Sequence, residues 1–266
     1  MRVASLAAAV LMAVAGPALA QRAPDPVPIE EWSLEKVSAM GEAIYDHDRA
    51  AWVATDALLA HLADGARTAG VAGWIVVEDG EALRVRFLRN DGGVPASAFD
   101  VPVRNGRAGA VQIPTDPTLS AAEQARFRAR QTAIDNIGRL RCSQNLNTVV
   151  LDDPDSDGWL VWLLTPMPES GAIPIGGHYR FRISADGGAV LRRDQLSNTC
   201  FFAERPPAEA REAMLFYTQI VSKTPVETHV FLSIQNQLTL VIMADDRYFS
   251  VGGRRIADIT EMVNRR

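Results

Sequence analysis

The spacing of apolar residues predicts three helices. From Leu34 to Leu62 the apolar residues recur at intervals near three and four, and Ser33 stands at the N-cap position. Ser120 and Glu123 form a capping box ahead of a second stretch with helical spacing. The pattern therefore predicts helices over residues 34–62, 120–138 and 207–221, the last with an ambiguous C-terminal half.

Elsewhere apolar and polar residues alternate, which is typical of strands with one buried face. Residues 74–78 and 82–88 flank Asp79-Gly80, a strong hairpin signal. Residues 159–164 are apolar throughout, which predicts a central strand buried on both faces. Further strands are predicted over residues 101–103, 110–113, 148–151, 178–184, 189–195, 228–234, 238–243 and 248–251.

This order of elements predicts an α+β fold with a mainly antiparallel sheet, a long N-terminal amphipathic helix and a second helix before the C-terminal strands. We expect residues 33–266 to form a single domain. The stretch from Pro114 to Pro117 is a candidate joint between residues 33–113, a helix with hairpins, and residues 119–266, a helix with antiparallel strands.

The N-terminus has the pattern of a secretory signal peptide over residues 1–20. Arg2 is followed by an apolar stretch, and Ala18-Leu19-Ala20 predicts cleavage after Ala20. The stretch is too short and too weakly hydrophobic for a membrane anchor, and no cysteine at the cleavage point can accept a lipid. Residues 21–32 read as an extended Pro-rich leader. We therefore expect a periplasmic or secreted protein.

Charge and cysteine content narrow the function classes. The formal net charge of -5 becomes -6 on loss of Arg2, so nucleic acid is not an expected partner. Cys142 and Cys200 are the only cysteines, and in an oxidising compartment we expect them to form a disulfide. The alternative makes Cys142 a nucleophile with His178 or His229 as base. It is disfavoured because Cys142 follows a predicted helix rather than opening one.

Histidines provide the main candidate for catalysis. His178, Arg180 and Arg182 share one face of an alternating strand, and Glu227 and His229 share one face of another predicted strand. If these strands are neighbours, His178, Glu227 and His229 could hold a metal or act as acid and base. The alternative is that they are hydrogen-bonded structural residues.

Arginines on strand faces provide a candidate ligand site. Arg84 and Arg86 point to one side of the first hairpin, and Arg180 and Arg182 to one side of a later strand. Such a face could attract a carboxylate or phosphate group. A solvated sheet surface would have the same composition.

Asp153, Asp155 and Asp157, with Gly158, match the first half of a calcium loop. The position that should carry the closing glutamate is Leu164, so the second half of the motif is missing. The alternative is a polar turn between two strands. We therefore expect no bound cofactor, and calcium is the alternative that this loop leaves open.

The sequence has no Gly-x-Ser-x-Gly, His-Glu-x-x-His or phosphate-loop motif. We therefore expect an exported, non-catalytic binding or interaction protein that takes a small anionic ligand or an envelope protein on a sheet face. Two alternatives remain: a hydrolase or metal-dependent enzyme using His178, Glu227 and His229, and a structural protein stabilised by calcium through residues 153–158.

Overall fold

The computed structural model of this chain describes residues 28–62, 70–207 and 214–265, which form an α+β fold as the sequence predicts. The predicted signal peptide and the leader up to residue 27 lie outside these residues. The helices are α1 (Leu34–His61), α2 (Ala121–Asp135), α3 (Glu227–Asn236) and α4 (Thr260–Asn264). The strands are β1 (Val71–Asp79), β2 (Ala82–Asp91), β3 (Val94–Arg104), β4 (Arg107–Ala108), β5 (Asn147–Asp152), β6 (Trp159–Leu164), β7 (Ile173–Pro174), β8 (Tyr179–Ile183), β9 (Val190–Gln195), β10 (Phe202–Ala203), β11 (Met214–Thr218), β12 (Thr239–Ala244), β13 (Arg247–Gly252) and β14 (Arg255–Asp258).

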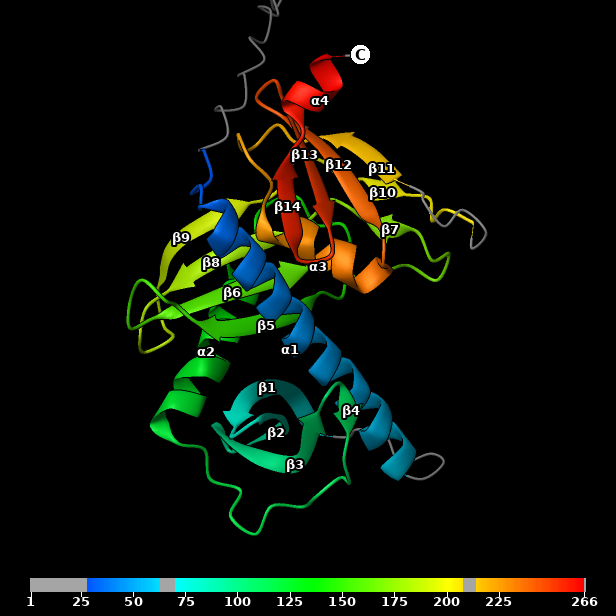
Figure 1. The fold of residues 1–266 in the computed structure, drawn as a ribbon. Coiled ribbons are helices and arrows are strands. Elements are labelled where there is room, and N and C mark those ends of the chain that lie inside the picture. Colours follow the sequence, from blue (N-terminus) through cyan, green and yellow to red (C-terminus); the bar gives the residue numbers. More distant parts are fainter. Residues whose placement is uncertain (1–27, 63–69, 208–213, 266) are drawn as a thin grey trace, which may run out of the picture.

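The long helix α1 runs past three sheets and contributes to two cores (Figure 1). Its Ser33 cap is confirmed, because the Ser33 side chain accepts a hydrogen bond from the Lys36 backbone N–H. Near its start it crosses α3 at Gly41, where an added Cβ would lie 2.5 Å from Cβ of Val230. The missing side chain at Gly41 is what lets the two helices approach.

The first sheet has the order β1-β2-β3-β4 and packs between two helices. The predicted hairpin is confirmed: β1 and β2 pair in antiparallel fashion around Gly80, whose φ is 62°. One face packs on the second half of α1, and the other packs on Phe127 of α2. The strand predicted over residues 110–113 is wrong, because this segment makes only an isolated bridge from Gln112 to Asp100.

The central sheet has the order β5-β6-β8-β9. Every residue of β6 is buried, which confirms the prediction of a central strand. Val161 and Phe181 pack against α2, whereas Trp162 lies in the core formed with α1 and α3. The sheet therefore forms the middle layer of the molecule (Figure 1).

The C-terminal sheet has the order β11-β12-β13-β14. Two predictions for this part of the chain are wrong. Residues 228–234, predicted as a strand, belong to helix α3. All residues from Glu227 to Ser233 are buried, so this helix lacks the polar face that produces a helical period in a sequence. Residues 214–218, placed inside a predicted helix, form β11 in parallel with β12. Residues 208–213 of that predicted helix lie outside the described part.

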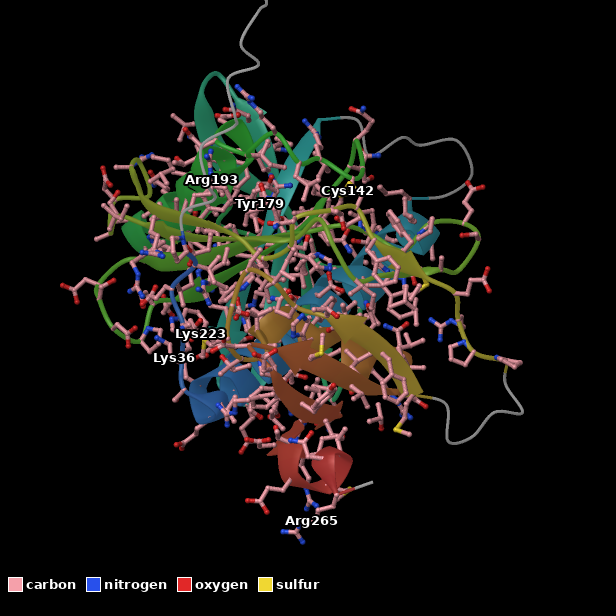
Figure 2. The ribbon with its side chains drawn as sticks, turned by 90° about the horizontal axis from the view of Figure 1, so that it is seen from above. Lys36, Cys142, Tyr179, Arg193, Lys223 and Arg265 are labelled. Carbon is pink, nitrogen blue, oxygen red and sulfur yellow. A yellow bond between two sulfur atoms is a disulfide. The ribbon has the colours of Figure 1, made fainter. Side chains whose placement is uncertain are left out.

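At the end of this sheet α4 projects outward, with Arg265 beyond it (Figure 2). The predicted disulfide between Cys142 and Cys200 is confirmed, with the two Cα atoms 5.4 Å apart. It joins the segment after α2 to the segment after β9. Gly177, with a φ of 87°, packs directly against the Cys142 side chain. None of the helices that the structure describes is long and apolar enough to cross a membrane.

Candidate functional site

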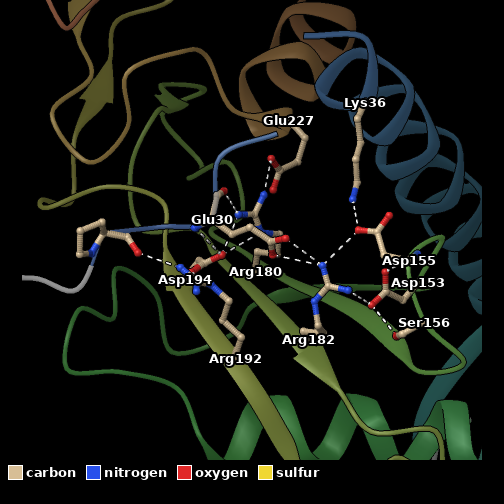
Figure 3. A network of polar contacts seen from close by, with 11 residues as sticks. Glu30, Lys36, Asp153, Asp155, Ser156, Arg180, Arg182, Arg192, Asp194 and Glu227 are labelled. Atoms are coloured by element: carbon tan, nitrogen blue, oxygen red, sulfur yellow. Dashed lines mark hydrogen bonds and ion pairs between the residues drawn. The ribbon is translucent and has the colours of Figure 1, made fainter. Parts of the chain in front are cut away.

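Arg180, predicted as a ligand-binding residue, is buried and paired within the chain (Figure 3). Its Nη2 lies 2.7 Å from Oδ2 of Asp194 on β9, and its Nη1 lies 3.1 Å from Oε2 of Glu227 on α3. The guanidinium also donates to the Glu30 carbonyl and stacks 3.8 Å from the ring centroid of Trp32. Because only 2% of the Arg180 side chain is exposed, its donors serve the fold rather than an external anion.

Arg182 and the predicted calcium loop contact each other (Figure 3). Arg182 donates to the Asp153 carboxylate and lies 3.3 Å from the carboxylate of Asp155, which also pairs with Lys36. Asp157 is exposed. Within the described ranges no group of three or more His, Cys, Asp or Glu side chains is arranged to hold a metal ion. Lys36 and Arg182 thus pair with two of the three carboxylates on which the calcium hypothesis depended, Asp153 and Asp155.

This ion-pair network anchors residues 28–30, the described end of the predicted Pro-rich leader. Arg182 Nη2 lies 3.1 Å from both carboxylate oxygens of Glu30, and Arg192 Nη2 donates to the Pro28 carbonyl over 2.8 Å. Burial alone would raise the pKa of Glu30, but the hydrogen bond and charge of Arg182 outweigh it and hold this pKa below its ordinary value. The segment that was predicted to lack structure of its own is bound here to the central sheet.

The structure buries His178, Glu227 and His229 in the same core region but does not assemble them into an accessible group. His178 Nδ1 accepts from the Thr165 N–H over 3.1 Å, and its Nε2 lies 2.7 Å from the Pro174 carbonyl. Glu227 accepts from Nε1 of Trp162 over 2.8 Å and from Arg180. In His178 and Glu227, backbone groups and core side chains therefore occupy the atoms that acid–base chemistry would use.

Burial keeps both histidines neutral. It lowers the pKa of His178 to about 4. For His229, burial, and then repulsion from nearby His178 when both rings are protonated, lower the pKa to about 3. Glu227 and His229 lie in the first turn of α3, so the prediction that they share one face of a strand is wrong.

The arginines of the first hairpin also have internal partners. Arg86 lies 3.1 Å from Asp100 on β3 and 2.6 Å from Glu123 on α2, in a site that is almost closed to solvent. Arg84 pairs with Asp79 over 2.6 Å at a half-exposed position of the same hairpin. Arg86 therefore fastens the first sheet to α2.

A concave surface of about 700 Å³ lies between the central and C-terminal sheets, and no sequence pattern indicated it. A second one, of about 720 Å³, lies between α1 and the first sheet, where Asp46, His47 and Glu78 are among its lining residues. The walls of the first come from residues 28–31, the end of β9, residues 218–223 and the turn between β12 and β13. Charges of both signs line it: Glu31, Arg193, Lys223, Asp245 and Asp246.

A smaller pocket of about 250 Å³ adjoins this cleft and shares Asn198, Thr218, Gln219 and Ile220 with it. Tyr217 and His229 also line it, with ring centroids 5.3 Å apart and ring planes at 70°. The Tyr217 hydroxyl is buried and has no hydrogen-bond partner among the described residues. Burial raises the pKa of Tyr217 well above its ordinary value.

Sequence reasoning did not single out Tyr217, although a signal was present. Leu215 and Tyr217 alternate with the exposed residues Met214, Phe216 and Thr218, which is the two-residue period of a strand. The orphaned hydroxyl has no signature in the sequence.

Comparison with models of known families gives no match for this chain, and comparison with curated proteins gives none either. The functional argument therefore depends on the geometry of the site.

Proposed function

We propose that this protein is an exported, non-catalytic binding protein, and that the cleft between its central and C-terminal sheets receives an extended peptide segment of an envelope protein. The observation that carries the proposal is the cleft of about 700 Å³ with its adjoining uncharged pocket.

Export is supported by the leader and by the disulfide. Residues 1–20 combine a basic start, an apolar stretch and a small-x-small cleavage pattern. The Cys142–Cys200 bond is of the kind that persists in oxidising compartments such as the periplasm.

Expression of the full chain in a Gram-negative host tests export. We expect periplasmic protein that begins at Gln21 by N-terminal sequencing, with both thiols protected from alkylation after unfolding without reductant. Ala18→Arg, which removes the small residue of the cleavage pattern, should leave the chain uncleaved. Wild-type protein of full length in the cytoplasmic fraction, with two reactive thiols, would contradict the assignment.

The cleft is favoured as the binding site because the other candidate donors are already engaged. Arg86, Arg180 and Arg182 all bind carboxylates of this chain. An anionic ligand on those sheet faces would have to displace a buried partner. The cleft instead presents exposed side chains, including Asn198, Thr218 and Ile220.

The chemistry of the lining fits a peptide better than a small anion. Arg193 and Lys223 can meet acidic groups, while Glu31, Asp245 and Asp246 can meet basic ones. Ile220 is 68% exposed and gives an apolar side chain a surface to cover. Peptides carry both charges, amides and apolar groups along one chain.

Panning a phage library of random heptapeptides on immobilised mature protein tests this proposal. We expect enriched sequences that bind wild type and lose roughly tenfold in affinity for Ile220→Asp, which places a charge between cleft and pocket. Ile113→Asp is the matched control, since Ile113 is 76% exposed and lies outside the cleft. Binding of the enriched peptides should be equal in Ile113→Asp and wild type. Failure to enrich any sequence over bare support, or equal loss in both variants, rejects the cleft as a peptide site.

A further inference from the structure

We propose that the pocket lined by Tyr217 and His229 is a subsite for a neutral group that carries a hydrogen-bond acceptor, of the carboxamide class, on an apolar or aromatic body. The pocket opens from the proposed peptide cleft, so this inference deepens the proposed function and rests on it for its biological context.

The first observation is the unpaired Tyr217 hydroxyl. Buried polar groups nearly always have partners, and this hydroxyl has none among the described residues. Tyr217 is held in place by β11, whose backbone pairs with β12 at Ile242. The Tyr217 side chain lines the pocket, and a donor that has no partner in the described part of the chain is suited to bind an acceptor from a ligand.

The second observation is that no lining residue carries a charge. The lining side chains are neutral: Ile175, Gly176, Ser197, Asn198, Thr199, Phe201, Tyr217, Thr218, Gln219, Ile220 and His229. His229 Nδ1 accepts from the Val226 N–H over 3.0 Å, which places the ring proton on Nε2 of a neutral imidazole. A carboxylate or ammonium group would lose its water there without gaining a counter-charge, whereas a carboxamide would not bring a charge at all.

The third observation concerns the walls and the size. Ile175 and Phe201 give the pocket apolar walls, and Ile220 and Phe201 are 68% and 45% exposed, so a ligand would bury them further. The volume of about 250 Å³ is below the usual range for drug-sized ligands. It therefore fits one side chain or a single substituted ring.

The test uses three fragments of one shape: benzamide, benzoate and toluene. In a titration of ¹⁵N-labelled mature protein, we expect benzamide to shift the amide signals of residues 197–201 and 217–220 saturably. Benzoate should leave them unchanged, because its charge has no partner in the pocket. Toluene, which offers no acceptor, should bind at least roughly tenfold more weakly than benzamide.

Tyr217→Phe separates binding from folding, because it removes the hydroxyl and keeps the ring. We expect it to bind benzamide roughly tenfold more weakly and to melt no lower than wild type, since the hydroxyl has no partner to lose. Tyr179→Phe is the matched control: its hydroxyl donates to the Leu140 carbonyl over 2.8 Å. That variant should melt lower and bind benzamide normally.

Equal shifts with benzamide and benzoate, or unchanged benzamide binding by Tyr217→Phe, would overturn the inference. So would a lower melting temperature of Tyr217→Phe without any loss of binding, which would mean that the hydroxyl is structural. If peptides bind the cleft but benzamide does not bind, this inference alone fails. If benzamide binds as expected but no peptide is enriched, the peptide proposal alone fails.

Discussion

At the scale of single residues, buried histidines couple the stability of this protein to pH. Three of its four histidines, His47, His178 and His229, are buried. Burial lowers the pKa of His47 and of His178 to about 4, from an ordinary value of 6.5. Between these values the unfolded chain binds a proton at each site and the folded chain does not. Their contribution to stability is therefore complete above pH 6.5 and declines as the pH falls toward 4.

His178→Gln tests this linkage. The variant should have a shallower dependence of the unfolding free energy on pH between pH 4.5 and 6, by up to about 1.4 kcal/mol per pH unit, which corresponds to one proton. Urea unfolding followed by circular dichroism at several pH values measures it. Burial also raises the pKa of Asp48 to about 6. This shift makes the folded protein less stable as the pH rises, opposite to the effect of the histidines, but it is the same in the variant and in wild type. His61→Gln, at an exposed position, is the control and should keep the wild-type slope. Equal slopes in all three proteins would exclude a buried, neutral His178.

At the scale of elements, the contact between α1 and α3 depends on one glycine. An added Cβ at Gly41 would also lie 2.6 Å from the Glu227 carbonyl oxygen, where α3 begins. For Gly41→Ala, helix propensity therefore predicts a higher unfolding free energy, whereas packing predicts a lower one. Alanine at an unconstrained helical glycine would stabilise by about 1 kcal/mol.

We expect Gly41→Ala to lower the unfolding free energy by about 1–3 kcal/mol, because the added methyl group meets backbone as well as the Val230 side chain. The midpoint of guanidinium unfolding measures the change. Ala39→Gly, at an exposed position of the same helix, is the control for helix propensity and should lower the unfolding free energy by about 1 kcal/mol. A stabilised Gly41→Ala variant would show that the two helices can separate at no cost.

Elements were predictable where a turn, a helix cap or a continuous apolar run marks them in the sequence. The hairpin of β1 and β2, the capped starts of α1 and α2, and the apolar strand β6 all carried local signals that the structure confirms. Helix α3 did not, because it is buried on all sides and its β-branched and aromatic residues resemble a strand. The candidate residues Arg180 and Arg182 were found, but their partner Glu30 lies about 150 positions away. No local pattern encodes such a pairing, and none encodes the cleft between two sheets.

At the scale of the whole molecule, helices α1 and α2 each contribute side chains to two hydrophobic cores. The helix α1 gives Ile44 to the core with the central sheet and Leu58 to the core with the first sheet. Helix α2 packs against both of these sheets as well, with Ala129 on one side and Phe127 on the other. Separation at the segment from Pro114 to Pro117 would therefore expose apolar surface on both helices, which is costly.

We accordingly expect residues 33–266 to unfold as one cooperative unit. Pulsed hydrogen exchange in increasing guanidinium, read by mass spectrometry, should give the same midpoint for peptides from β1–β3 and from β5–β9. Leu58→Ala leaves a cavity in the core between α1 and the first sheet. It should lower both midpoints together, by an amount that corresponds to about 2–5 kcal/mol of unfolding free energy. Leu160→Ala, in the other core, is the reciprocal variant and should do the same. If Leu58→Ala lowers only the first midpoint, the first sheet folds independently, and the chain has two domains joined by α1. The reciprocal pair distinguishes this case from a general loss of cooperativity, because two independent domains would each respond to only one of the two substitutions.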